Sequence, residues 1–366
     1  MTPLSVSIDL GISNIDILLR RGSEVEHTCL ATTTRPVLEQ FEAVLGRFSP
    51  LERAAVTGGQ YRLLPDQVGG TRLVKISEVA AIGRGGLYLA GLEQALVVSG
   101  GSGTAMVAAR GRTAAHVTGS AVGGGTLQGL GRLLLGETNP LEIDRLALQG
   151  DANHVDLTLV EAVGAGVGRL PLNANAVNFG RLVQEGVLLL PQDIAAGLVR
   201  LVGQVIAVVA INAARAEGLE TIVVTGHLVD LLSVRKVLDE VAGFYGAKII
   251  VPLNPGTGTA VGAMVCMEEA DPNYSPVLPL SIPNRDEVRS FSNHLHTAGK
   301  RWQGVIFGWN AEYIPESRRK PVESKMTFTP AEFWIGESGI WFFSRMWEHG
   351  KDKEPVEFID DRGIVK

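Results

Sequence analysis

Short apolar segments of this chain run directly into glycine clusters that also contain serine or threonine. Three such loops occur early, at 9–13 (DLGIS), 99–104 (SGGSGT) and 119–126 (GSAVGGGT). Because glycine has no Cβ, backbone N–H groups in such loops can approach phosphate oxygens, and a following helix N-terminus adds a favourable dipole. Together with later loops at 225–226 and 254–259, the pattern predicts a nucleotide cleft between two half-domains.

Two common nucleotide-binding motifs are missing from these loops. No segment reads Gly-x-x-x-x-Gly-Lys-Ser/Thr, so a P-loop is excluded. The loop at 99–104 lacks the third glycine of a dinucleotide fingerprint, and the residues after it favour a strand instead of a helix. A nicotinamide enzyme is therefore disfavoured.

Composition narrows the class further. The 366 residues are 45% hydrophobic and 20% charged, which is enough apolar material for a large core. A net charge of −6 argues against a nucleic-acid binder or a polybasic membrane protein. The two cysteines, Cys29 and Cys266, cannot form a disulfide framework or a zinc site. The chain opens without a basic segment typical of secretory signals, so we expect a cytoplasmic protein.

Strand and helix signals alternate over the first 270 residues, which predicts an α/β fold. The apolar stretch Leu201–Ala214 is too short to span a bilayer and favours a buried helix. We expect strands at 4–10, 15–19, 54–57, 73–76, 95–99, 105–109, 221–225 and 248–251, and helices at 36–45, 78–92, 129–135, 193–217 and 259–267, with Asp193 as the N-cap of the fourth helix.

The composition changes near residue 270. Of 21 aromatic residues, 13 lie in 285–366, including all five tryptophans. The segment 271–284 carries four prolines, which is typical of a stiff linker. We therefore predict a catalytic-type unit at 1–270 and an added small α+β domain at 285–366. That domain is expected to hold a helix at 289–300 and strand-like pieces at 304–309, 325–329, 332–335, 339–343 and 356–359.

The stretch 98–155 resembles the type II (eukaryotic-type) pantothenate kinases, members of the actin/Hsp70/sugar-kinase fold. The resemblance is carried by GSGT at 101–104, VTGSAVGGGTLQGL at 117–130, LLLG at 133–136, QGD at 149–151, NFG at 178–180, VVTG at 223–226 and TAVGA at 259–263, in consistent order over about residues 5–266. It implies a two-lobed actin-like ATPase/sugar-kinase fold built from duplicated ribonuclease H-like halves.

The resemblance also implies a reaction. Such enzymes transfer the γ-phosphoryl group of ATP, with Mg²⁺, to the primary hydroxyl of pantothenate, the first step of coenzyme A biosynthesis. It further implies a homodimer with a long helix near the interface, and regulation by coenzyme A or acyl-coenzyme A. Neither a nucleic acid nor a membrane is an expected partner.

Site residues follow from the same resemblance. Glu78 matches the carboxylate that acts as a base at the start of a helix, and Asp9 matches the acid near the metal and phosphates. The predicted nucleotide-binding residues are Asp9, Gly11, Ser13, Gly101, Ser102, Gly103, Thr104, Gly123, Gly124, Gly125 and Gly226, and the predicted substrate-binding residues are His116, Ser102 and Thr104.

Two departures leave a second interpretation open. The family's first loop reads Asp-x-Gly-Gly-Thr-x-x-Lys, but this chain has Ile12 at the second glycine and Asp16 at the lysine. His116 stands where the family has an arginine on the pantothenate side. An anion beside a triphosphate adds repulsion unless it points away or helps to hold Mg²⁺. The alternative is a catalytically impaired nucleotide- or CoA-sensing relative whose C-terminal domain binds a partner.

Overall fold

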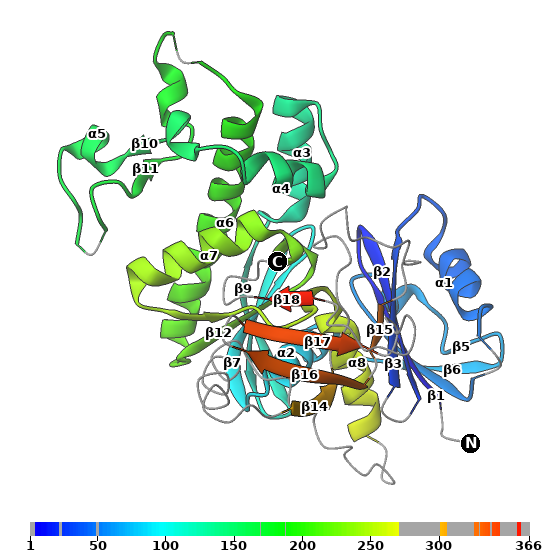
Figure 1. Cartoon of the computed structure of the whole chain (residues 1–366). Helices are drawn as coiled ribbons and strands as arrows, with labels where there is room; N and C mark the ends of the chain where they lie inside the picture. The colour runs from blue at the N-terminus through cyan, green and yellow to red at the C-terminus, as the bar shows by residue number, and fades with distance from the viewer. Residues whose placement is uncertain are drawn as a thin grey trace. The chain divides into compact units, whose positions relative to one another are not determined.

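Two mixed β-sheets with helices packed on them form the framework of the computed structural model (Figure 1). The structure describes residues 4–21, 24–48, 51–168, 170–186 and 188–270, together with five short strands in 301–359. The chain divides into two units. Unit 1 comprises Met1–Glu93 and Pro252–Lys366, and unit 2 comprises Gln94–Val251.

Unit 1 is built on a sheet in the order β15-β3-β2-β1-β4-β6-β5. Its elements are β1 (Leu4–Leu10), β2 (Asn14–Arg21), β3 (Glu24–Ala31), α1 (Val37–Leu45), β4 (Arg53–Thr57), β5 (Gln67–Val68), β6 (Thr71–Lys75), α2 (Glu78–Ala90), α8 (Gly258–Glu269) and β15 (Met326–Phe328).

Unit 2 is built on a sheet in the order β13-β12-β7-β8-β9, with a small separate pair, β10-β11. Its elements are β7 (Gln94–Gly100), β8 (Thr104–Arg110), β9 (Thr113–Ser120), α3 (Gly124–Leu135), α4 (Pro140–Ala147), β10 (Leu157–Thr158), α5 (Leu159–Val163), β11 (Asn175–Val177), α6 (Pro191–Ala216), β12 (Thr221–Thr225), α7 (Leu232–Tyr245) and β13 (Lys248–Ile250).

The two main sheets repeat one topology. In unit 1, β1 pairs antiparallel with β2, β2 antiparallel with β3, and β4 lies parallel between β1 and β6. In unit 2, β7, β8, β9, β12 and β13 follow the same order with the same directions. This repetition is the predicted duplication of halves.

Alternation along the strands assigns each sheet face. In β1, Val6, Ile8 and Leu10 are buried in one apolar cluster with Phe41 of α1. Ser7 and Asp9 alternate with them and therefore belong to the opposite face. The Ser7 hydroxyl donates there to the carbonyl oxygen of Ala260 in α8, at 2.7 Å. Asp9 thus lies on the face that α8 covers.

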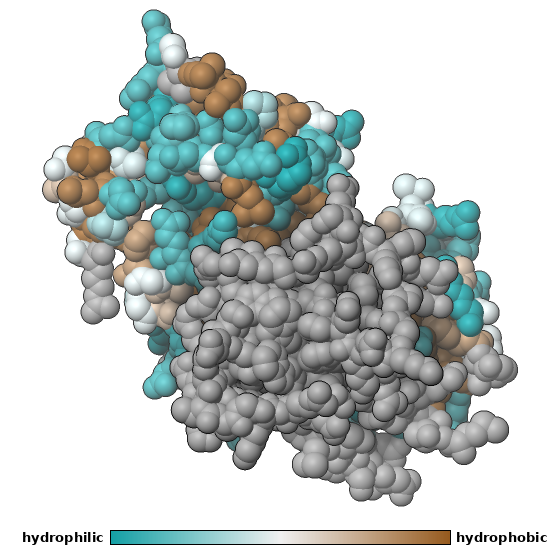
Figure 2. All heavy atoms as spheres, in the orientation of Figure 1, coloured by the Kyte–Doolittle hydropathy of each residue, from teal (hydrophilic) through white to brown (hydrophobic). Residues whose placement is uncertain are grey.

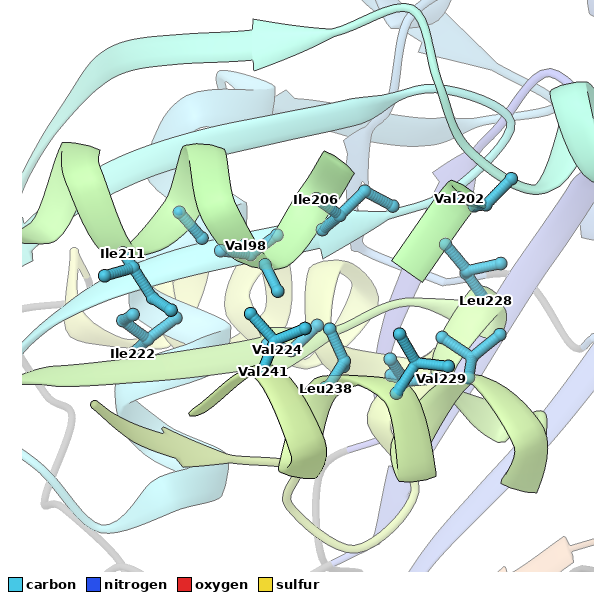
Figure 3. Close-up of a cluster of buried hydrophobic side chains, with 14 of the residues drawn as sticks. Val98, Val202, Ile206, Ile211, Ile222, Val224, Leu228, Val229, Leu238 and Val241 are labelled. Carbon is cyan, nitrogen blue, oxygen red and sulfur yellow. The ribbon is translucent and has the colours of Figure 1, made fainter. Parts of the chain in front are cut away.

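The largest apolar cluster lies in unit 2 and surrounds α6. Figure 3 shows side chains from α6, α7 and β12 meeting in it, among them Ile206, Leu238 and Val224. Burying one such side chain fully contributes about 1.5–3 kcal/mol. The cluster therefore fixes the position of β12 and of the loop that follows it.

Helix α6 differs from the sequence expectation in two respects. It begins at Pro191, which occupies the first turn, and Asp193 is not its N-cap. The Asp193 carboxylate instead accepts the N–H of Asp151 at 2.8 Å and contacts Nδ1 of His154 at 2.8 Å. At 26 residues, α6 is long and apolar enough to cross a membrane by length and composition. The prediction that this apolar segment is too short to span a bilayer was therefore wrong. Half of its residues are nevertheless buried in the unit 2 core, as expected of a core helix.

The C-terminal strands are β14 (Arg301–Val305), β16 (Pro330–Gly336), β17 (Gly339–Ser344) and β18 (Glu357–Ile359), which form an antiparallel sheet. All five strand-like pieces expected there overlap a strand of the structure, β15 included. The piece at 304–309 shares only its first two residues with β14. The predicted linker at 271–284 and helix at 289–300 lie outside the described residues, and a separate domain at 285–366 stays a prediction.

Candidate active site

Asp9 and Glu78 come to the same edge of the unit 1 sheet. Strands β1, β4 and β6 are parallel, so their carboxyl ends share one edge. Asp9 is the register partner of Thr57, and the N–H of Ile76 donates to the carbonyl of Val56 at 2.9 Å. Glu78 begins α2 just beyond the end of β6. Ligands of open α/β sheets bind at such carboxyl edges.

The turn between β1 and β2 carries Gly11 and Ser13 and is braced by β3. Thr32 donates its N–H to the carbonyl of Ser13 at 2.9 Å and its hydroxyl to the carbonyl of Gly11 at 3.2 Å. A Cβ on Gly11 would lie 2.7 Å from the carbonyl oxygen of Asn14, so this tight turn requires glycine. Ile12, at the family's second glycine, is 73% exposed.

Asp16 lies opposite Asp9 in the β1–β2 register, which puts both side chains on one face. It is 4% exposed, and Oδ1 lies 2.7 Å from Nε2 of His27 on β3, also 4% exposed. The anion at the family's lysine position therefore has a buried imidazole as neighbour. Sequence reasoning missed His27. Its proximity to Asp16 depends on the register of β2 with β3, which pairs Asp16 with Cys29 and is not visible in the sequence.

Glu78 occupies the first turn of α2. The Ser77 side chain caps the helix by accepting the N–H of Ala80 at 3.1 Å. The Glu78 side chain keeps an exposed surface, while the protein packed around it raises the pKa of its carboxyl above the usual range. An accessible carboxylate with a raised pKa is suited to accept a proton from a hydroxyl group.

In unit 2, two predicted glycine loops interlock. The turn between β7 and β8 lies against the start of α3, where the N–H groups of Gly124 and Gly125 donate to the carbonyls of Gly101 and Ser102, at 2.8 and 2.9 Å. A Cβ on Gly123 would lie 2.7 Å from the carbonyl oxygen of Ser102. The triple glycine is therefore required by packing between the loops, and two of its backbone donors are used within them.

Thr104 and Gly103 belong to the same assembly. The Thr104 hydroxyl donates to the carbonyl of Val122 at 2.8 Å, and the Gly103 carbonyl accepts the N–H of Gly101 at 2.9 Å. Thr104 is 6% exposed. Its hydroxyl thus holds the α3 loop, and a binding role for it stays a prediction.

His116 lies within the edge strand β9, and Gly226 lies at the end of β12, next to the end of β7. His116 is exposed on the edge strand β9, next to a bulge at Val117, where the β8–β9 register shifts. Bulges of this kind redirect side chains beside functional sites. Gly226 follows β12 with φ +93°, and a Cβ there would collide with the carbonyl of Gly100. Gly226 therefore packs directly on the end of β7.

A buried polar network in unit 2 includes Phe179, which belongs to the NFG fragment at 178–180. Asp156 is fully buried, and its carboxylate accepts the N–H of Phe179 at 2.7 Å and a guanidinium N–H of Arg200 at 3.2 Å. Arg200 also donates to the side chain of Asn153 at 2.8 Å. Burial raises the pKa of Asp156 despite these donors. The network anchors the segment between α4 and α6, which gives the NFG fragment a structural role.

Comparison with known proteins supports the resemblance. Residues 94–249 match the protein family described as Fumble. A type II pantothenate kinase of Oceanobacillus iheyensis is 28% identical over 227 residues, which cover 60% of this chain and 83% of that protein. One from Staphylococcus aureus is 28% identical over 269 residues, 71% of this chain and 98% of that protein. These matches bear out the expected resemblance to these kinases.

Solved structures confirm the fold class. Component A of the (R)-2-hydroxyglutaryl-CoA dehydratase of Acidaminococcus fermentans matches with a TM-score of 0.51 at 17% identity, over 72% of this chain and 97% of that one. The activator of the 2-hydroxyisocaproyl-CoA dehydratase from Clostridium difficile, with bound ADPNP, matches with a TM-score of 0.50 at 16% identity, over 74% and 99%. The chain has the actin-like ATPase/sugar-kinase fold.

Proposed function

This chain is related to the type II pantothenate kinases, and we propose that it phosphorylates pantothenate to 4′-phosphopantothenate with ATP, the first step of coenzyme A biosynthesis. One observation carries the proposal. Asp9 and Glu78, the two acids with assigned roles, come from distant parts of the sequence to the same carboxyl edge of the unit 1 sheet. The sequence relatives, all kinases by name, support the phosphoryl-transfer chemistry.

Glu78 acts as the base in this proposal. It accepts the proton of the primary hydroxyl as that oxygen forms a bond to the γ-phosphorus. The bond from the γ-phosphorus to the bridging oxygen breaks, ADP leaves with that electron pair, and Glu78 then releases its proton to water. A base of this kind contributes about 10²–10⁴-fold to the rate.

The residues around Asp9 fit a Mg²⁺ ion. The Asp9 carboxylate is a hard oxygen ligand of the type that Mg²⁺ prefers. Gly58, with φ +93°, packs closely beside Asp9, because a Cβ there would lie 2.5 Å from Oδ1 and 2.5 Å from the carbonyl oxygen of Leu10. When bound at Asp9, Mg²⁺ would supply positive charge for the phosphate oxygens.

The remaining predicted groups belong to unit 2. We assign the interlocked loops at 101–104 and 123–126 to phosphate binding and Gly226 to the adenosine side. His116, exposed on β9, offers one hydrogen bond to the pantothenate side.

A coupled assay of ADP release with ATP, Mg²⁺ and pantothenate tests the activity. Turnover by the wild type and its loss in Glu78→Ala support the proposal. Glu39→Ala is the matched control, because Glu39 is also an exposed acid in the first turn of a helix, α1. It is expected to keep wild-type turnover. Turnover only with another hydroxyl compound would replace pantothenate as the substrate.

A second candidate is a catalytically impaired relative that senses a nucleotide or coenzyme A. The position of Asp16 directly opposite Asp9 favours it, since a second carboxylate on that face weakens the attraction for phosphate. Tight binding of ATP or coenzyme A measured by calorimetry, without any turnover, would establish this alternative. Inhibition of turnover by acyl-coenzyme A would instead support a regulated kinase.

We also propose a cytoplasmic homodimer. Leu201, Val205 and Val208 of α6 lie on one helical face and are only half-buried. Among the described residues of unit 2, apolar side chains such as Val163 and Val183 are exposed, and brown patches mark this part of the surface in Figure 2. Light scattering coupled to size exclusion is expected to give twice 38.9 kDa at micromolar concentration. A monomer mass would contradict the dimer.

A further inference from the structure

The duplicated topology gives this protein two equivalent strand ends, one in each half. Strand β4 ends at Thr57 and is followed by Gly58, and strand β12 ends at Thr225 and is followed by Gly226. Both glycines have φ +93°. The two segments read AAVTG at 54–58 and IVVTG at 222–226. Thr57 and Thr225 therefore occupy equivalent positions in the two halves of the chain.

Thr225 satisfies its hydroxyl within its own sheet. It is 1% exposed, and Oγ1 donates to the carbonyl of Val98 on the neighbouring strand β7 at 3.3 Å. Its register partner on β7 is Ser99. A threonine at this strand end thus has a backbone acceptor within reach, and in unit 2 it uses that acceptor.

Thr57 does not do the same in unit 1. It is 0% exposed, and Oγ1 has no hydrogen-bond partner in the part of the chain that the structure describes. A buried hydroxyl without a partner loses its hydration and gains nothing in return, which is rare in folded proteins. Valine would fill the same space without that loss. A hydroxyl retained at such a position calls for a partner that arrives with a ligand.

The neighbours of Thr57 indicate which ligand it would meet. Its register partner on β1 is Asp9, and adjacent residues on parallel strands project from the same face. Ala55, two residues earlier in β4, is buried on that face against Ala81 of α2 and Ala263 of α8. Gly58 then turns the backbone closely around the Asp9 carboxylate. The Thr57 hydroxyl and the Asp9 carboxylate therefore stand side by side at the carboxyl edge of the sheet.

We propose that Thr57 is a nucleotide-binding residue, whose hydroxyl forms a hydrogen bond with an oxygen of the phosphate–Mg²⁺ group held at Asp9. This inference rests on the proposed function, since it takes the nucleotide as the ligand. The oxygen belongs either to a phosphate, which accepts a hydrogen bond from the hydroxyl, or to a water bound to the metal, which donates one to it. In the ligand-free protein the unpaired hydroxyl costs free energy. Ligand binding recovers that cost by supplying the hydrogen bond.

Calorimetric titration with the non-hydrolysable analogue AMP-PNP tests the assignment on the full chain. Thr57→Val is expected to weaken binding at least tenfold in the presence of Mg²⁺, and Thr57→Ser, which keeps the hydroxyl, is expected to stay within about threefold of the wild type. A loss of the same size in EDTA identifies a phosphate oxygen as the acceptor. A loss seen only with Mg²⁺ identifies a metal-bound water.

Thermal unfolding separates this role from a structural one. Thr57→Val removes no internal hydrogen bond, so its Tm without nucleotide is expected to equal or exceed that of the wild type. Thr225→Val is the matched control, because it removes the bond to Val98, and its Tm is expected to fall. If Thr57→Val lowers the Tm as Thr225→Val does and leaves AMP-PNP affinity unchanged, Thr57 is structural and the inference is wrong.

The same titration separates a failure of the role of Thr57 from a failure of the proposed function. Wild-type protein that binds AMP-PNP, with Thr57→Val binding equally well, overturns only the role of Thr57. Wild-type protein that binds no nucleotide, with or without Mg²⁺, overturns the proposed function and the role of Thr57 together.

Discussion

Nε2 of His27 lies 2.7 Å from Oδ1 of Asp16, and both side chains are buried in unit 1. The pair joins neighbouring strands β2 and β3 on the face that also carries Asp9. A buried carboxylate requires such a partner, because an uncompensated charge in a protein interior is strongly unfavourable. The acid that replaces the family's lysine is therefore integrated into the sheet.

Removing the imidazole is expected to destabilise the protein. His27→Ala leaves the Asp16 carboxylate buried with one donor fewer, at a cost of about 3 kcal/mol in the free energy of unfolding. His27→Gln keeps an N–H donor at a similar distance and is expected to lose less. Urea unfolding followed by circular dichroism measures both. Equal stability of His27→Ala and the wild type would show that the pair contributes nothing.

Neutralising Asp16 is expected to strengthen nucleotide binding. Asp16→Asn keeps a hydrogen-bonding group beside His27 and removes one negative charge from the face of Asp9. Because like charges repel, we expect the Kd for Mg-ATP to fall several-fold, with a larger effect at low ionic strength. Calorimetric titration at two salt concentrations measures the change. An unchanged Kd at both would mean that Asp16 is too far from the phosphates to matter.

Much of the fold was predictable, because its signals are local. The alternation in 4–10 and the apolar run at 221–225 gave correct strands, and the helix of α2 follows from its Ser77 cap and the left-handed Gly91 at its end. Helices α4, α5 and α7 and strands β3, β5, β9, β10 and β11 were missed. Strand β3 and helices α4 and α7 each carry several charged residues among their apolar ones, as in 232–245, and their periodicity becomes clear only once the core is known.

The candidate site was predictable in part, for a different reason. Asp9, Glu78 and the glycine loops follow from motif spacing, which a family resemblance preserves. The partnership of Asp16 with His27 and the orphaned hydroxyl of Thr57 depend on strand register, which sequence alone does not reveal. The triple glycine was read as a phosphate loop, whereas contacts between Gly124 and Gly101 show that it also serves packing.

Close packing of α2 on α8 makes one glycine especially sensitive. A Cβ on Gly262 of α8 would collide with the carbonyl oxygen of Ala81 in α2, and both are backbone groups that cannot move aside. Gly262→Ala is expected to cost about 3 kcal/mol or more by overpacking. Gly129→Ala in α3 is the control, because its Cβ meets no atom within 4 Å. It is expected to gain about 0.5–1 kcal/mol from helix propensity. Chemical denaturation of both variants provides the comparison.

The raised pKa of Glu78 predicts the acid limb of the activity profile. A general base works only when it is deprotonated, so kcat is expected to fall as the pH drops through the folded-state pKa, which lies above the ordinary glutamate value of 4.5. Initial rates between pH 4 and 8 locate this limb, with Glu39→Ala as the unaffected control. A limb at or below pH 4.5 would assign the proton transfer to another group.

The same shift makes a separate prediction for stability. Because folding raises the pKa of Glu78, the folded state binds its proton more tightly than the unfolded state does, and the ionised carboxylate is slightly unfavourable at neutral pH. Glu78→Gln is therefore expected to abolish turnover while its Tm at pH 7 stays equal to or above that of the wild type. A large drop in Tm would show that the carboxylate stabilises the start of α2, and loss of turnover in that variant would then reflect unfolding.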